Sequence, residues 1–334
     1  MRALVYTGPQ KIEFIDVPDP EPKSDEVVIK IDAVGICGSD MHAYLGHDDR
    51  RPAPLILGHE AAGVVTTGAS AGRRVVINPL VTCGMCRDCL GGRSNLCAKR
   101  EIVSMPPRQG AFAEQMAIPE RNLIDVPENL DMTHAALAEP LATAWHGVVL
   151  ADRHAARPIS ESRAMVLGSG AVGLGAALSL KAFGCMDVTI AETNPLRRDT
   201  AIDSGFSSVI DPTVDGAVQE GFADIVIDAV GNKHTRAAAI KAARPGGVIV
   251  HIGLADGVDG FDARRLTLQE ITFVGAYTYT MNDFQATVAA MASGALGDLQ
   301  WIEQRGLGEG AVAFDDLLAG RSGAAKIVLH PGAF

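Results

Sequence analysis

One segment near the middle of the chain constrains the fold more than any other feature. Residues 164–167 are apolar, an Ala/Leu-rich stretch of helical character reaches Phe183, and a second apolar run covers 187–191. Three glycines lie between the first run and the helical stretch, namely Gly168, Gly170 and Gly173. This order predicts a strand, a glycine turn, a helix and a second strand. In such a turn the first glycine permits the sharp bend, the second lets backbone amides approach a phosphate, and the third lets the helix pack closely on the strand. We therefore predict that a dinucleotide pyrophosphate binds at the helix N-terminus.

An acidic residue, Glu192, directly follows the second strand. A carboxylate at this place accepts hydrogen bonds from an adenosine ribose diol and repels a 2′-phosphate, so it favours NAD(H) over NADP(H). Arg197 and Arg198 lie just downstream, could contact a 2′-phosphate, and so leave use of both cofactors open. An ordinary strand-to-helix turn with a surface glutamate is the alternative. Further contacts with the cofactor are expected from Ala171, Val172, Arg197, Val230 and Ile252.

The alternation of strand and helix patterns continues beyond this segment. Residues 223–228 and 247–252 form apolar runs, with a helix-like stretch over 234–243 between them. This pattern predicts a doubly wound parallel sheet. Before about residue 145 the chain instead shows short β-type runs, such as 27–31 and 74–77, separated by proline and glycine. Because 334 residues exceed what one hydrophobic core usually organises, we expect two domains, and the final run 326–330 can return to the first of them.

The net charge and the absence of targeting signals restrict the classes of molecule that the protein is expected to bind. The formal net charge of −11 argues against nucleic acid or an anionic membrane as a partner, because both require clustered Lys and Arg. The N-terminal residues lack the pattern of a secretory signal, and no apolar run reaches the length of a membrane span. We expect a cytoplasmic protein that acts on a small molecule.

Four of the six cysteines lie close together in the sequence. Cys83, Cys86, Cys89 and Cys97 have the spacing C-x₂-C-x₂-C-x₇-C. In a reducing compartment this density indicates metal binding rather than disulfides. Four thiolates can surround one tetrahedral Zn²⁺ with no open position, which predicts a structural zinc site. An iron–sulfur cluster and four free thiols are the alternatives.

Two segments outside this cluster carry other metal-binding residue types. Residues 35–42 contain Cys37, Ser39 and His42, and residues 58–60 contain His59 and Glu60. A thiolate, an imidazole and carboxylates suit a zinc site with three protein ligands and an exchangeable fourth position. Taken singly, a cysteine or histidine of this kind more often packs in a core.

Together these segments resemble the zinc-containing medium-chain alcohol dehydrogenases. The resemblance rests on G-I-C-G-S-D-x-H, G-H-E, the cysteine spacing, A-E-P-L at 138–141, the glycine turn and the ending A-A-K-I-V-L, and it covers essentially the whole chain. It implies an α/β protein with a GroES-like, mostly β catalytic domain (1–145 and 276–334) and a Rossmann domain that binds the nucleotide (146–275). It also implies that Cys37 and His59 bind a catalytic zinc, with Glu60 and Glu139 as carboxylates that bind it directly, alternately with water, or from further out. Ser39 and His42 then occupy the places of a proton relay, and Asp40 orients His59.

The presence of Glu139 in place of a second cysteine makes the chain most similar to the polyol branch of that family. The resemblance implies two zinc ions per chain, NAD(H), an alcohol or polyol as substrate, and a homodimer or homotetramer. Sorbitol-type members carry an Arg-Tyr pair where this chain has Thr278 and Tyr279, which puts sorbitol itself in doubt. Sugar-phosphate and threonine-type dehydrogenases are the enzymatic alternatives. A nucleotide-binding structural or sensor protein is the alternative without catalysis.

Overall fold

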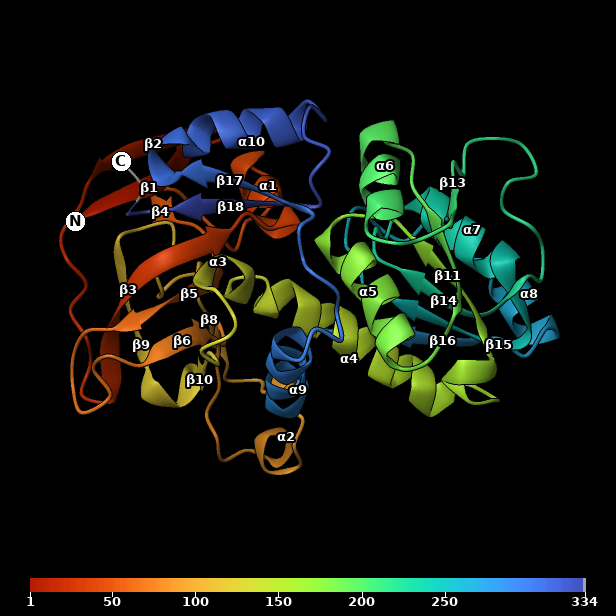
Figure 1. Cartoon of the computed structure of the whole chain (residues 1–334), viewed down its shortest axis with the longest axis horizontal. Helices are drawn as coiled ribbons and strands as arrows, with labels where there is room; N and C mark the ends of the chain where they lie inside the picture. The colour runs from red at the N-terminus through yellow and green to blue at the C-terminus, as the bar shows by residue number, and fades with distance from the viewer. Residues whose placement is uncertain (333–334) are drawn as a thin grey trace.

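The computed structural model describes residues 1–332, and one half of it is built on a six-stranded sheet (Figure 1). The strand order is β13-β12-β11-β14-β15-β16, and all neighbours are parallel. The strands are β11 (Arg163–Leu167), β12 (Asp187–Ala191), β13 (Ser208–Ile210), β14 (Ala223–Asp228), β15 (Ala243–His251) and β16 (Thr272–Gly275). This arrangement confirms the predicted doubly wound sheet.

Helices cover both faces of this sheet, as the Val- and Ile-rich strands require. Buried side chains on one face pack against α4, α5 and α6, and those on the other face pack against α7 and α8. The helices are α4 (Ala138–His154), α5 (Ala171–Ala182), α6 (Pro195–Asp203), α7 (Lys233–Ala242) and α8 (Ala263–Leu268). Asparagines begin two of them, because Asn194 caps α6 and Asn232 caps α7 through their side-chain oxygens.

The other half contains a seven-stranded sheet that joins both ends of the chain. Its order is β10-β6-β5-β3-β18-β17, and β9 also pairs with β3. The strands are β3 (Glu26–Gly35), β5 (Glu60–Val65), β6 (Arg74–Ile77), β9 (Gln115–Pro119), β10 (Leu123–Asp125), β17 (Ile302–Gly306) and β18 (Lys326–His330). The pairing of Val328 with Gly35 returns the C-terminal segment to the first domain, as expected.

Smaller elements complete this half. A three-stranded sheet has the order β2-β1-β4, and β7 pairs with β8. Their bounds are β1 (Arg2–Gly8), β2 (Lys11–Asp16), β4 (Leu55–Ile56), β7 (Leu80–Val81) and β8 (Glu101–Ile102). The helices are α1 (Gly38–Tyr44), α2 (Arg87–Leu90), α3 (Met132–Ala135), α9 (Met281–Ala292) and α10 (Gly310–Leu318). Among residues 1–332, no helix has both the length and the apolar character that a membrane span requires.

Helix α4 lies between the two halves (Figure 1). One continuous cluster of buried apolar side chains runs from the seven-stranded sheet through α4 to α5, and it includes Ala33, Leu141 and Leu174. The predicted domain limit between residues 145 and 146 falls inside this helix, whereas the limit at 275 coincides with the end of β16. Because α4 packs on both halves, the sequence has no exposed loop there that would mark a domain boundary. The domain boundaries at 145/146 and 275/276 stay a prediction.

Candidate active site and metal centres

Strand pairing brings the first group of predicted ligands together. Cys37 is the residue before α1, just after β3, and Glu60 begins β5 directly after His59. Strands β3 and β5 are antiparallel neighbours, and Gly35 at the end of β3 pairs with Glu60 at the start of β5. The segment that follows β3 therefore lies beside the segment that precedes β5. One ligand atom from each of Cys37, His59 and Glu60 lies within 4.8 Å of the others.

The buried side chain of Asp40 contacts the Cys37 and His59 segments. Asp40 is fully buried and accepts hydrogen bonds from the amides of Cys37 (3.0 Å) and Gly58 (3.3 Å). Its Oδ1 lies 3.5 Å from Nδ1 of His59, close enough to orient the imidazole but long for a hydrogen bond. Burial lowers the pKa of His59, but Asp40 and Cys37 outweigh that effect, and the pKa stands well above its usual value. The surroundings of the imidazole therefore favour positive charge.

A lysine from the far end of the chain neutralises Glu60. Nζ of Lys326, in β18, donates to Oε1 of Glu60 (2.7 Å) and to the carbonyl of Ile36 (2.8 Å). Both side chains of the ion pair are almost fully buried. Burial lowers the pKa of Lys326, but Glu60 and Cys37 raise it above its ordinary value. The sequence analysis placed Lys326 in a strand but did not predict this contact.

Glu139 lies beside the group rather than within it. The first turn of α4 carries this side chain, and Tyr279 donates a hydrogen bond to its Oε1 (2.9 Å). Burial, chiefly, and the neighbouring Glu60 raise the pKa of Glu139 to about 7, although His59 and Tyr279 act in the opposite direction. Glu139 is therefore a carboxyl group poised to change its charge near neutral pH.

The donor set fits zinc. Nδ1 of His59 and Oε2 of Glu60 are buried and find no hydrogen-bond partner among the described residues. Unpartnered buried polar atoms are costly, and a bound cation would satisfy Oε2. A thiolate, an imidazole and a carboxylate form a ligand set that catalytic zinc accepts. Ser39 and His42 lie one turn apart on α1, both half-buried, and a relay between them stays a prediction.

The four clustered cysteines converge as a second group. Their Sγ–Sγ distances are 3.5 Å for Cys86 to Cys89, 3.5 Å for Cys97 to Cys83 and 3.9 Å for Cys83 to Cys89. Sulfurs bound tetrahedrally at about 2.3 Å from one Zn²⁺ would be roughly 3.8 Å apart. Backbone amides of Met85 and Cys86 lower the pKa of Cys83 to about 6, whereas burial and Cys86 raise that of Cys89 to about 11. The spacing of the sulfurs matches a closed zinc site.

The glycine turn has the shape that the dinucleotide fingerprint requires. Gly168 has φ +92°, and a Cβ there would lie 2.6 Å from Val230. A Cβ on Gly173 would lie 2.0 Å from the carbonyl oxygen of Gly168, whereas one on Gly170 would meet nothing within 4 Å. The amide of Ala171 already donates to the carbonyl of Ala325 (3.1 Å), in the segment before β18. Val172, half-buried, follows in the first turn of α5.

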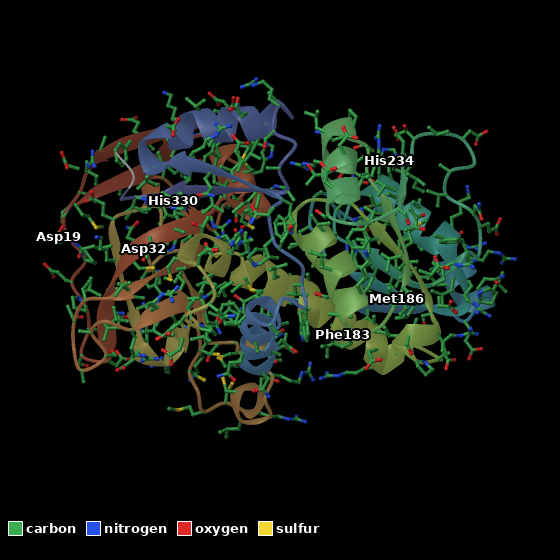
Figure 2. The ribbon with its side chains drawn as sticks, in the orientation of Figure 1. Asp19, Asp32, Phe183, Met186, His234 and His330 are labelled. Atoms are coloured by element: carbon green, nitrogen blue, oxygen red, sulfur yellow. The ribbon has the colours of Figure 1, made fainter. Side chains whose placement is uncertain are left out.

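A cavity of about 420 Å³ adjoins this turn. Its lining includes Gly168, Glu192, Val230 and His234, together with Pro212 and Thr213, which the sequence analysis missed (His234 is labelled in Figure 2). Ile252, also predicted to contact the cofactor, is buried and lies outside this lining.

Glu192 is held firmly within that lining. It accepts hydrogen bonds from the amides of Ser169 and Asn194, both at 2.8 Å. Neither predicted arginine lines the cavity, and Arg198 instead pairs with Asp211 (3.1 Å). Arg197 is half-buried, and its carbonyl accepts a hydrogen bond from Ser169 Oγ. The lining of the cavity thus includes the Glu192 carboxylate but neither Arg197 nor Arg198.

Comparison with known proteins gives consistent matches over both halves. Residues 23–128 match the family described as alcohol dehydrogenase GroES-like domain, and residues 171–293 match the family described as zinc-binding dehydrogenase. The chain is 33% identical to L-galactonate-5-dehydrogenase of Escherichia coli K12, over 89% of this chain and 88% of that protein. It is 30% identical to sorbitol dehydrogenase of Bacillus subtilis 168, over 99% and 97%. A zinc-binding dehydrogenase of Sinorhizobium meliloti 1021 bound to NADP has a similar structure, with TM-score 0.88, 27% identity and 99% of each chain covered.

Proposed function

The chain belongs to the zinc-containing alcohol dehydrogenase family with a GroES-like domain, and from this premise we propose that it transfers a hydride reversibly between a secondary alcohol or polyol and NAD⁺. The observation that carries the proposal is the convergence of Cys37, His59 and Glu60, with Glu139 beside them. In the proposed arrangement Cys37 and His59 hold the catalytic zinc, and Glu60 or Glu139 completes the set of ligands. When bound, zinc supplies Lewis-acid polarisation of the substrate oxygen, and NAD⁺ supplies the hydride acceptor.

The chain's own residues provide positioning and proton handling. Asp40 fixes the orientation of His59, because a carboxylate behind a ligating imidazole selects its tautomer. Lys326 offsets the charge of Glu60, so that two carboxylates tolerate burial in one site. Glu139, hydrogen-bonded to Tyr279, can hold or release a proton beside the substrate. Ser39 and His42 are proposed to pass that proton along α1 toward solvent.

In the nucleotide half we propose that the first turn of α5 beyond Ala171, beginning with the Val172 amide, contacts the pyrophosphate and that Glu192 binds the adenosine ribose. The pairing of Arg198 with Asp211 leaves that guanidinium less available to a 2′-phosphate, which supports NAD(H). Because the Sinorhizobium relative was solved with NADP, a direct comparison of the two cofactors belongs in the test.

We propose an unphosphorylated, hydroxylated carbon chain as the substrate. The names of the relatives indicate hydroxylated carbon chains, and the net charge of −11 disfavours a phosphorylated one. We propose a cytoplasmic protein, because cysteines that remain free of disulfides are typical of a reducing compartment. We also propose a homodimer or homotetramer, which analytical ultracentrifugation of the purified protein would decide.

The test is a panel of substrates followed at 340 nm with NAD⁺ and NADP⁺. The panel contains secondary alcohols, polyols, aldonates, a sugar phosphate and threonine. We expect turnover with the alcohols or polyols, and two zinc ions per chain by elemental analysis. Cys37→Ser and His59→Ala should abolish turnover while NADH binding, measured by fluorescence, survives. His154→Ala, which changes an exposed histidine at the end of α4, is the matched control. Full activity in either site variant would contradict the proposed ligand set.

A further inference from the structure

The cysteine lobe (residues 83–100) contacts a short segment that leads directly to Glu139. Asn95 Nδ2 donates to the carbonyl of Tyr277 (2.8 Å), and Arg100 Nε donates to the Tyr277 hydroxyl (3.2 Å). The Arg100 guanidinium also lies 4.8 Å from the centre of the Tyr277 ring. Asn95 and Arg100 flank Cys97, and Arg100 Nη1 donates to the Cys97 carbonyl (2.9 Å). Arg100 therefore contacts both Tyr277 and the backbone of Cys97, a proposed ligand of the structural zinc.

The other end of the segment 277–279 contacts Glu139, beside the proposed catalytic zinc site. Tyr279 is 1% exposed, donates to Glu139 and stacks on Phe284 with 5.0 Å between ring centres. Thr280 then caps α9 by accepting a hydrogen bond from the amide of Asp283. Only Thr278 separates the tyrosine held by the lobe from the tyrosine held by Glu139.

Thr278 has φ +49°, in the left-handed region that β-branched residues rarely adopt. Such a conformation persists only where the surrounding contacts impose it. Here Tyr277 and Tyr279 are each held by hydrogen bonds on either side of Thr278, and Thr278 Oγ1 itself donates to the Tyr277 carbonyl (2.8 Å). Loss of the anchor at Tyr277 would let Thr278 relax and would change the direction from which Tyr279 approaches Glu139.

We infer that Asn95 and Arg100 are positioning residues for the reaction, because they fix Tyr277 and, through it, the pair of Tyr279 and Glu139. The cysteine lobe thus positions a carboxyl group of the proposed active site in addition to stabilising the fold. The inference deepens the proposed function and rests on it.

The kinetic test compares Arg100→Ala, Arg100→Lys and Tyr277→Phe with Lys99→Ala, which removes the adjacent exposed cation. For the best alcohol or polyol of the panel, Arg100→Ala should lower kcat about five- to tenfold, the worth of one or two hydrogen bonds, because the carboxyl group that handles the proton loses its fixed position. Its KM should change less than about twofold. Arg100→Lys should restore part of the loss. The kcat effects of Arg100→Ala and Tyr277→Phe should add to less than their sum in the double variant, because both remove the hydrogen bond between Arg100 and the Tyr277 hydroxyl.

A second readout does not depend on turnover. Hydrogen exchange of a peptide covering 276–284 should be faster in Arg100→Ala than in the wild type or in Lys99→Ala, with two zinc ions retained. Unchanged exchange would overturn the inference. A loss of activity accompanied by loss of zinc would also overturn it, because the lobe would then act on stability alone. Should the wild type oxidise none of the alcohols, the proposed function fails, and the exchange experiment still decides whether the lobe holds this segment.

Discussion

Two glycines of the same turn allow fold stability and cofactor binding to be separated. In Gly173→Ala the new methyl group would lie 2.0 Å from a backbone oxygen of Gly168. Carbon–oxygen contacts are normally about 3.3 Å or longer, so α5 must move away from β11 by roughly 1 Å. Overpacking of this kind costs up to about 3 kcal/mol. Alanine regains about 1 kcal/mol by its higher helix propensity. The expected net loss of about 2 kcal/mol corresponds to a fall in Tm of roughly 4–8 °C.

Gly170→Ala is the matched variant. Gly170 precedes α5 with φ −66°, and an added Cβ would meet no atom within 4 Å. The fold should therefore lose less than about 1 kcal/mol. That open space is where a pyrophosphate would approach the backbone, so Kd for NADH should rise at least about tenfold. Thermal unfolding and titration of NADH fluorescence measure the two quantities on the same samples. Wild-type affinity in Gly170→Ala would refute the assignment of this turn to the pyrophosphate, and an unchanged Tm in Gly173→Ala would refute the steric argument.

Three further predictions concern buried charge and the metal sites. Lys326→Met should lower the free energy of unfolding by about 3–5 kcal/mol in urea titrations, because it leaves the buried Glu60 carboxylate without its cation, and Lys326→Met/Glu60→Leu should lose less. Burial raises the pKa of Asp283, but its hydrogen bonds with His146 and Thr280 outweigh burial and hold the pKa below the ordinary 3.8. A depressed carboxyl pKa stabilises the fold above the unfolded-state value, and that contribution disappears as pH falls through the folded-state value. The Tm deficit of Asp283→Asn should therefore be full at pH 5 and shrink toward pH 3, and a deficit independent of pH would contradict the reasoning. Cys97→Ser should lose one zinc per chain by elemental analysis together with stability, whereas Cys185→Ser, outside both clusters, should retain two.

The parts of the fold that the sequence predicted well depend on short-range signals. The glycine turn lies between a strand with four successive apolar residues, β11, and the helix α5, and the spacing of its glycines reflects contacts within one strand-turn-helix unit. The four cysteines likewise lie within fifteen positions, so their spacing alone restricts how they can meet. In both cases the residues that must come together are already neighbours along the chain.

Helix α4 shows where such signals fail. The short β-type runs predict a mostly β chain up to about residue 145, yet α4 begins at Ala138. Leu141, Ala144 and Val148 are fully buried, and α4 packs on elements of both halves. A helix covered on several sides lacks the clear apolar and polar faces that identify an exposed amphipathic helix. Its motif at Glu139 indicated chemistry, but its secondary structure depended on packing that the sequence does not display.

Contacts between distant segments explain why the candidate site was only half predictable. The sequence supplied Cys37, His59, Glu60 and Glu139, all from the first half of the chain. Each buried carboxylate among them needs a donor, since an unpaired buried charge costs several kcal/mol. Those donors, Lys326 for Glu60 and Tyr279 for Glu139, lie 266 and 140 positions away. No local pattern links such pairs, because a lysine before an apolar run and a tyrosine in a loop have many ordinary uses.

The same pairs explain why the end of the chain returns to the first domain. Without β18, the Glu60 carboxylate would lose its lysine partner, and the strand β3 would keep only β5 as its neighbour at Gly35. Without the segment at 277–279, Glu139 would lose its donor, and the cysteine lobe would lose its contact at Tyr277. The catalytic group is therefore completed only after the nucleotide-binding half has been traversed. The proposed site is for this reason built from segments on both sides of the six-stranded sheet in the sequence, and removal of residues 276–332 would leave two buried carboxyl groups without their partners.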